Sequence, residues 1–127
     1  MAKTSRAGIA RIYHAFFYSM KGFKAAFKYE AAARQEFMLA VILSIIAFFI
    51  ATSLAELMLL LILPWLTFTF EIINSAIEAV VDRISDDYHE LSGRAKDLGS
   101  AAVFVFLVLT PLCYVAVFGK YMGWWFN

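Results

Sequence analysis

The chain has 127 residues, of which 63% are hydrophobic and 17% aromatic, and its formal net charge at pH 7 is +1. Soluble domains are usually ~45–50% apolar, so this composition excludes a protein that folds in water alone and favours an integral membrane protein. The length favours one domain, residues 1–127. The balanced charge gives no support for a nucleic-acid partner, and the one cysteine, Cys113, excludes a disulfide framework.

The first expected element is an amphipathic helix over about residues 7–28. Six apolar residues recur at spacings of three and four, which places them on one helix face: Ile9, Ile12, Phe16, Met20, Phe23 and Phe27. Basic residues lie off this stripe. Such a helix beside a membrane span either rests among the lipid headgroups, attracted to anionic lipid, or packs on the protein's own spans. We favour residence at the membrane surface, with Gly22 as the candidate position for a kink.

Three apolar segments follow, at about residues 30–52, 57–84 and 95–119. A helix needs ~20 residues to cross the hydrocarbon core. The segments lack the alternation of barrel strands, so helices are the structure that satisfies their backbone groups in lipid. The predicted fold is therefore all-α and membrane-embedded, with one surface helix and three transmembrane helices.

Lysine and arginine are unevenly distributed between the predicted loops. Seven, from Lys3 to Arg34, precede the first span and three lie in residues 82–97, whereas the link at 53–56 has none and the tail has only Lys120. Because positive residues tend to stay in the cytoplasm, we expect a cytoplasmic N-terminus and an outer C-terminus. Trp124 and Trp125 in the tail fit an aromatic anchor at the outer interface.

The second span contains the strongest chemical signal. Glu71, Asn74 and Glu78 are three and four residues apart, and therefore share a helix face, with Asp82 one turn further on. A carboxylate deep in a span costs ~2.5–3.5 kcal/mol even on the lenient insertion scale, so it should face a protein interior or a wet cavity. Either these residues form a functional site or they hold helices together. The adjoining charged loop favours the functional site.

A second acidic segment, residues 29–36, precedes the first span. Glu30 and Arg34 are four residues apart and could form an ordinary surface pair. However, Glu30 should lie at the same membrane depth as Glu78, and two carboxylates that meet there could hold Mg²⁺ together with phosphates and waters. No Gly-rich phosphate loop of known type is present, and His14 and His89 are too isolated for a zinc site. These residues alone predict an acidic membrane site without identifying its reaction.

Two long motifs, EIINSAIEAVVDR at residues 71–83 and YHELSGRAKD at residues 88–97, resemble the bacterial diacylglycerol kinase family. EAAARQE at residues 30–36 is also similar, and the resemblance runs from about residue 8 to the end of the third span. It implies transfer of phosphate from MgATP to diacylglycerol, giving phosphatidic acid. It also implies a homotrimer with active sites shared between chains, in the bacterial inner membrane among lipids.

The resemblance further implies roles for individual residues. Glu71 matches the general base, Asn74 lies by the reaction centre, and Glu30 and Glu78 match the metal-binding carboxylates. Nucleotide contacts are implied for Arg11, Tyr18, Glu30, Glu78, Asp87, Tyr88, His89, Lys96 and Asp97. Contacts with the lipid substrate are implied for Ser19, Arg34, Glu71 and Ser100. Met20 and Tyr114 stand where the best-known member has tryptophan, which should affect packing more than chemistry.

Two alternatives remain open. One is an undecaprenol kinase of the same fold, although the wording of the two long motifs favours the diacylglycerol branch. The other is a non-enzymatic membrane protein, such as a small transporter subunit or a proton-relay protein that uses Glu71. A structural scaffold is disfavoured, because scaffolding does not need carboxylates at membrane depth.

Overall fold

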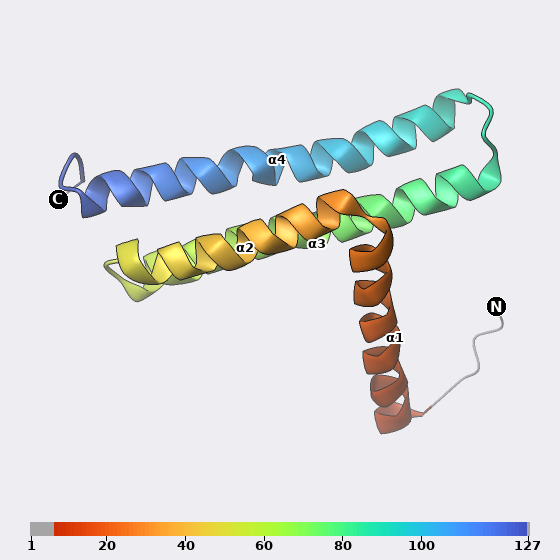
Figure 1. Ribbon diagram of the computed structural model, residues 1–127, viewed down its shortest axis with the longest axis horizontal. Helices are drawn as coiled ribbons and strands as arrows, with labels where there is room; N and C mark the ends of the chain where they lie inside the picture. Colours follow the sequence, from red (N-terminus) through yellow and green to blue (C-terminus); the bar gives the residue numbers. More distant parts are fainter. Residues whose placement is uncertain (1–6, 127) are drawn as a thin grey trace.

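The structure, a computed structural model, describes residues 7–126 and consists there of four helices without a strand (Figure 1). They are α1 (Gly8–Tyr29), α2 (Ala31–Ile50), α3 (Leu54–Ile84) and α4 (Glu90–Tyr121). The expected all-α class is confirmed. Lys3 and Arg6, which contribute to the predicted orientation, lie outside the described residues.

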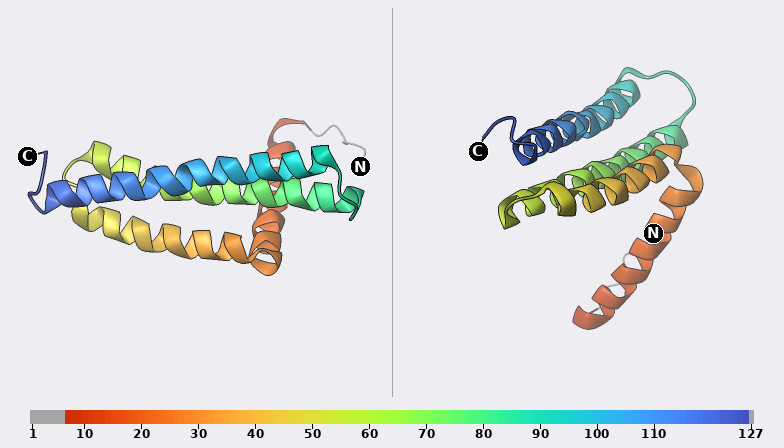
Figure 2. Two further views of the ribbon diagram at one scale, coloured as in Figure 1. Left: turned by 90° about the horizontal axis from the view of Figure 1, so that it is seen from above. Right: turned by 60° about the vertical axis from the view of Figure 1, so that its left-hand side comes forward.

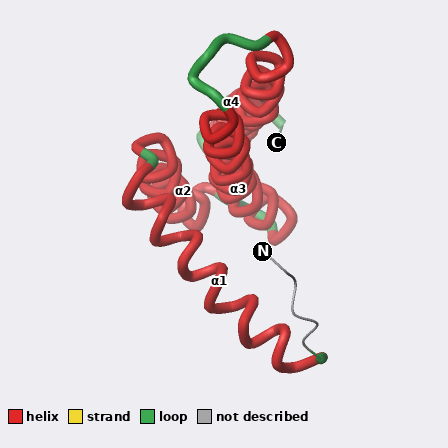
Figure 3. Tube along the Cα trace, turned by 90° about the vertical axis from the view of Figure 1, so that its right-hand side faces the viewer, coloured by secondary structure: helices red, strands yellow, loops and turns green. Residues whose placement is uncertain are grey.

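Helices α2, α3 and α4 are each long and apolar enough to cross a membrane. They run alternately up and down, and α3 packs against both α2 and α4 along its length, whereas α2 and α4 touch each other little (Figures 1 and 3). The end of α3 and the start of α4 lie at one end of the bundle and the C-terminus lies at the other, whereas α2 begins part-way along α3, short of the α3–α4 loop (Figures 1 and 2). The segments that carry Glu30, Glu78 and His89 are therefore in the same half of the bundle (Figure 1).

Helix α1 lies crosswise to the three long helices (Figure 2). It runs through Gly22, and the chain changes direction at Glu30, whose backbone is extended (φ −115°, ψ 105°). The N–H of Glu30 donates to the carbonyl of Ala26 (3.0 Å), and Arg34 Nη1 donates to the carbonyl of Phe27 (2.8 Å). A side chain from the first turn of α2 thus satisfies the last turn of α1, and the corner needs neither glycine nor proline.

The two ends of the apolar stripe on α1 have different environments. Phe23 and Phe27 stack on Phe68 of α3, with ring centroids 6.4 and 6.3 Å apart, and Phe27 also contacts the ring of Phe37. In contrast, Ile9 near the start of α1 is 85% exposed. The last turns of α1 therefore pack on the spans, and the first turns leave apolar side chains uncovered. Membrane-surface residence stays a prediction for those first turns.

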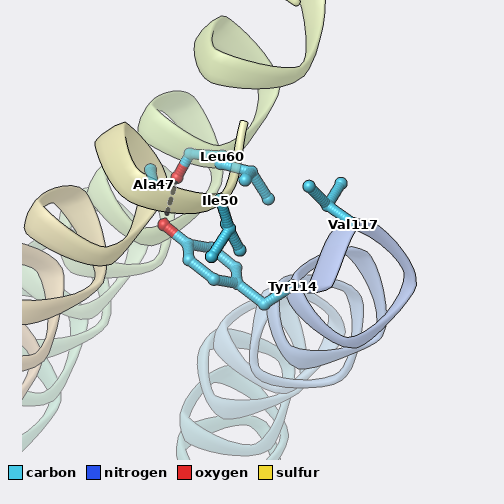
Figure 4. Packing of buried hydrophobic residues seen from close by; sticks show 5 residues of the cluster. All are labelled: Ala47, Ile50, Leu60, Tyr114 and Val117. Carbon is cyan, nitrogen blue, oxygen red and sulfur yellow. Dashed lines mark hydrogen bonds between the residues drawn. The ribbon is translucent and has the colours of Figure 1, made fainter. Parts of the chain in front are cut away.

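Tyr114 of α4 connects all three long helices through its hydroxyl, and Figure 4 shows its hydrogen bond to Leu60. Pro64 lies inside α3 and has no N–H, so the carbonyl of Leu60 lacks its helical donor. The Tyr114 hydroxyl donates to this carbonyl (2.6 Å) and also lies 2.9 Å from the carbonyl of Leu43 in α2. An unsatisfied backbone group costs several kcal/mol in lipid. Tyr114 thus compensates for the proline in the neighbouring helix.

Replacing Tyr114 with phenylalanine is expected to lower the free energy of unfolding by about 1–3 kcal/mol, because it leaves the Leu60 carbonyl buried and unpaired. The measurement is unfolding of purified protein in mixed detergent micelles. Tyr121→Phe, in the same helix but with an exposed side chain, is the control. Equal stability of the two variants would contradict this role for Tyr114.

The opposite end of the bundle is held by a polar cluster around Glu56. Its carboxylate pairs with Lys120 at the end of α4 and accepts hydrogen bonds from the backbone N–H and the hydroxyl of Thr52, both at 2.8 Å. Ser53 caps the first turn of α3 by accepting from the N–H of Glu56 (3.2 Å). The link between α2 and α3 is thereby joined to α4.

Candidate active site

The acidic face of α3 lies in the half of the bundle where α1 meets α2. Asn74 is buried at 7% exposure, Glu71 and Glu78 are half-buried, and Asn74 Nδ2 donates to Glu78 Oε1 (3.4 Å). Glu30, Glu36 and Glu78 all lie near enough to Glu71 for their charges to repel it. The structure therefore brings both acidic segments of the sequence together.

Cationic charge reaches this face from α4. Lys96 Nζ lies 2.6 Å from Asp82 Oδ1, and the attraction of Glu78 also acts on the Lys96 ammonium. Lys96 and Asp82 are both partly exposed, so water weakens the pair and it contributes little to stability. Its consequence is positional, since it holds the Lys96 ammonium beside the carboxylate of Asp82.

A polar cavity of about 310 Å³ lies next to Lys96, where the loop between α3 and α4 turns. Asp87, Tyr88 and His89 also line it. Ser85 Oγ accepts from the N–H of Asp87 (3.0 Å), and His89 Nδ1 accepts from the N–H of Leu91 (3.1 Å), which caps α4. This hydrogen bond leaves His89 Nε2 as the ring nitrogen that can donate. Four of the residues expected to contact a nucleotide thus share one cavity.

Other expected site residues do not meet this cavity within one chain. Arg11, Tyr18 and Ser19 lie on exposed parts of α1, which packs on α2 and α3 and extends away from the loop before α4 (Figures 1 and 3). Ser19 Oγ donates to the carbonyl of Ala15 (2.9 Å). Ser100 is exposed on α4.

Two further expected residues have other positions. Arg34, expected to contact the lipid substrate, donates to the Phe27 carbonyl at the corner between α1 and α2. Asp97 follows Lys96 and is exposed, but it does not line the polar cavity.

The donor set fits a magnesium ion better than a closed metal site. Within residues 7–126, no group of three or more His, Cys, Asp or Glu side chains is placed to hold a metal. Glu30 and Glu78 are half-buried carboxylates in the same half of the bundle. Mg²⁺ is usually held by one or two carboxylates, with substrate phosphates and waters completing its shell. Two half-buried glutamates supply the carboxylate ligands of such a site.

Sequence reasoning assigned no role to Glu36 or Gly99. Glu36 lines an apolar cavity of about 300 Å³ between the long helices, together with Thr67 and Thr110. Gly99 is buried on α4 against Asn74. Both residues carried a signal in the sequence. Glu36 is an acid at the start of an apolar run, and Gly99 is a small residue inside an apolar run, where small residues often mark close packing of helices.

Comparisons with known proteins give the family. Residues 17–118 match the model of prokaryotic diacylglycerol kinase. The diacylglycerol kinase of Escherichia coli (strain K12) is 43% identical over 116 residues, covering 91% of this chain and 95% of the relative. That of Haemophilus influenzae is 43% identical over 114 residues, covering 90% and 95%. That of Pseudomonas aeruginosa is 44% identical over 112 residues, covering 88% and 91%.

The matched region extends from the middle of α1 to the last turn of α4. It includes both acidic segments, the polar cavity and all three long apolar helices. The family expected from the two motifs is therefore confirmed, and this multi-pass membrane protein belongs to the prokaryotic diacylglycerol kinase family.

Proposed function

We propose that this protein is a diacylglycerol kinase that transfers the γ-phosphoryl group of ATP to the free hydroxyl of diacylglycerol, giving phosphatidic acid and ADP. The observation that carries the proposal is the cluster of carboxylates around Glu71 in the same half of the bundle as a polar cavity, in a chain of this family. In this half of the bundle a lipid hydroxyl and a water-soluble nucleotide can meet.

In the proposed reaction Glu71 accepts the proton of the lipid hydroxyl. The hydroxyl oxygen forms a bond to the γ-phosphorus, the bond from that phosphorus to the β–γ bridging oxygen breaks, and ADP leaves. Phosphoryl transfer depends mainly on positioning and charge stabilisation. Asn74 directs its amide at Glu78, and Lys96 supplies positive charge for phosphate oxygens. The cavity lined by Tyr88 and His89 receives the nucleotide.

Glu30 and Glu78 are the proposed magnesium ligands. When bound, the ion neutralises charge on the transferring phosphates. Both glutamates act on Glu71 electrostatically, so a cation between them would also relieve the repulsion among the carboxylates. Magnesium binding would therefore explain why several carboxylates lie together at membrane depth.

An apolar groove beside the acidic face suits the acyl chains of the substrate. Its volume is about 580 Å³, and it lies between the last turns of α1 and the adjoining parts of α2 and α3. The lining is almost wholly apolar: Phe23, Phe27, Phe37, Trp65, Phe68, Thr69, Ile72 and Ile73. Ile72 directly follows Glu71, so a chain in the groove would hold its headgroup near the base.

A homotrimer with shared sites is part of the proposal. Arg11 and Tyr18 lie on the helix that extends away from their own chain's cavity, so a neighbouring chain must supply them if they contact the nucleotide. We also propose the bacterial inner membrane as the location, with the site and the N-terminus in the cytoplasm, because the basic residues gather at that end.

The experiment that tests the function measures products from purified protein in mixed micelles with MgATP and diacylglycerol. Phosphatidic acid and ADP should form in equal amounts. ATP hydrolysis without a phosphorylated lipid would contradict the proposal.

Glu30→Gln and Glu78→Gln are each expected to raise the magnesium concentration that gives half-maximal activity by at least about tenfold. Even the loss of a group that only hydrogen-bonds to a metal ligand typically lowers metal affinity by that factor. Magnesium titrations of lipid phosphorylation measure this effect. Glu90→Gln is the control, because Glu90 is an exposed acid that pairs with Arg94 and does not line the polar cavity. Unchanged magnesium dependence in both site variants would show that the ligand assignment is wrong.

A further inference from the structure

Gly99 of α4 lies directly against the Asn74 carboxamide of α3. A Cβ atom built on Gly99 would collide with Asn74 Oδ1 and would lie 3.3 Å from Asn74 Cγ and 3.5 Å from Ile77 Cδ1. Real Cβ atoms essentially never approach heavy atoms as closely as this one would approach Oδ1. Even alanine at this position would therefore push the carboxamide away or separate the two helices.

The position of that carboxamide matters because its nitrogen contacts Glu78. Asn74 Nδ2 donates to Glu78 Oε1 (3.4 Å), whereas Asn74 Oδ1 is buried and has no hydrogen-bond partner among residues 7–126. No hydrogen bond to the oxygen therefore fixes the amide. What restrains it on the oxygen side is the backbone surface of α4 at Gly99.

The same close approach supports the cationic side of the site. Lys96 is one turn before Gly99 on α4 and reaches Asp82 at 2.6 Å. A wider separation of α3 and α4 at Gly99 would draw Lys96 away from the acids on α3. Gly99 thus affects the positions of both the Asn74–Glu78 pair and the Lys96 ammonium.

We propose that Gly99 is a positioning residue for phosphoryl transfer, because its missing side chain sets the Asn74 carboxamide on Glu78. This inference rests on the proposed kinase function and adds a residue that touches neither nucleotide nor lipid. A misplacement of about 1 Å can reduce turnover by about 10²-fold, so Gly99→Ala is expected to lower kcat by about 10- to 100-fold. The KM for diacylglycerol should change by less than about twofold, because the apolar groove proposed for the lipid is lined by α1, α2 and α3 and does not include Gly99.

The experiment is a double-mutant cycle of Gly99→Ala with Asn74→Ala, read as kcat and as the thermal unfolding midpoint in mixed micelles. Asn74→Ala removes the oxygen that a new Cβ would strike. Gly99→Ala should therefore lower both quantities in the wild-type background and change the midpoint little when Asn74 is absent. Where Asn74→Ala keeps measurable turnover, its kcat should also be insensitive to Gly99→Ala.

Gly119→Ala is the matched control. A Cβ there would collide with the ring of Trp125 at the far end of the same helix, so it tests steric conflict without affecting the site. It should lower the midpoint and leave kcat close to wild type.

Each outcome decides the inference. Wild-type kcat in Gly99→Ala, or the same midpoint loss with and without Asn74, would overturn it. If Gly99→Ala alone does not fold, folding of the double variant supports the inference, and failure of both overturns it. Wild-type protein that forms no phosphatidic acid would instead contradict the kinase function, and the midpoint cycle would still test the contact.

Discussion

Glu71→Ala is expected to reduce kcat for diacylglycerol phosphorylation by about 10²- to 10⁴-fold, the usual contribution of a general base. Glu71 is a half-buried acid surrounded by Glu30, Glu36 and Glu78. Removing a carboxylate that neighbouring acids repel should not weaken folding. The loss should therefore appear in turnover, with the assembly and the thermal midpoint preserved.

Two variants separate this effect from a general loss of structure. Glu71→Gln keeps the shape of the side chain but cannot accept the proton, so it should be as inactive as Glu71→Ala. Glu56→Ala, in the same helix at the opposite end, breaks the ion pair with Lys120 and should lower stability while kcat is retained. Turnover of Glu71→Ala at the wild-type rate would exclude Glu71 as the base.

Lys96→Gln is expected to reduce kcat/KM for ATP by about 10²- to 10³-fold, because a preorganised group that stabilises charge in the transition state typically contributes that much. Lys96 lines the polar cavity and lies beside Asp82 and Glu78. Steady-state kinetics with varied ATP and saturating diacylglycerol measure the effect.

Arg94→Gln is the control for Lys96. Arg94 is two residues earlier in α4, and its exposed guanidinium pairs with Glu90, outside the cavity. Its replacement should change kcat/KM by less than about twofold. A similar loss in both variants would indicate that general positive charge at the membrane surface matters, and not a specific contact from Lys96.

The helices could be predicted from the sequence because long apolar runs have few structural solutions in lipid. The shared face of Glu71, Asn74 and Glu78 followed from helical periodicity alone, and the structure confirms that Asn74 and Glu78 meet. The boundary between the surface helix and the first span was predicted near residues 28–30, but the sharp change of direction at Glu30 was not, since no glycine or proline marks it. Its cap, the Arg34 side chain, becomes visible only when two helices are placed.

Contacts between distant helices could not be predicted at all. The Tyr114 hydroxyl donates to the carbonyl left without a donor by Pro64, and Glu56 pairs with Lys120. Both contacts depend on the register between helices, which local periodicity does not determine. For the site, the sequence motifs gave the residue types, and one chain brings Lys96, Tyr88 and His89 to one cavity. Arg11 and Tyr18 stay apart from it, so their roles remain predictions that depend on a neighbouring chain.

The central claim is that a membrane alcohol, specifically diacylglycerol, receives the phosphate. The most direct measurement supplies purified wild-type protein with ATP labelled at the γ-phosphate and equal concentrations of diacylglycerol and undecaprenol in the same micelles. We predict that the label appears mainly in phosphatidic acid. Label mainly in undecaprenyl phosphate, or in neither lipid, would contradict the account.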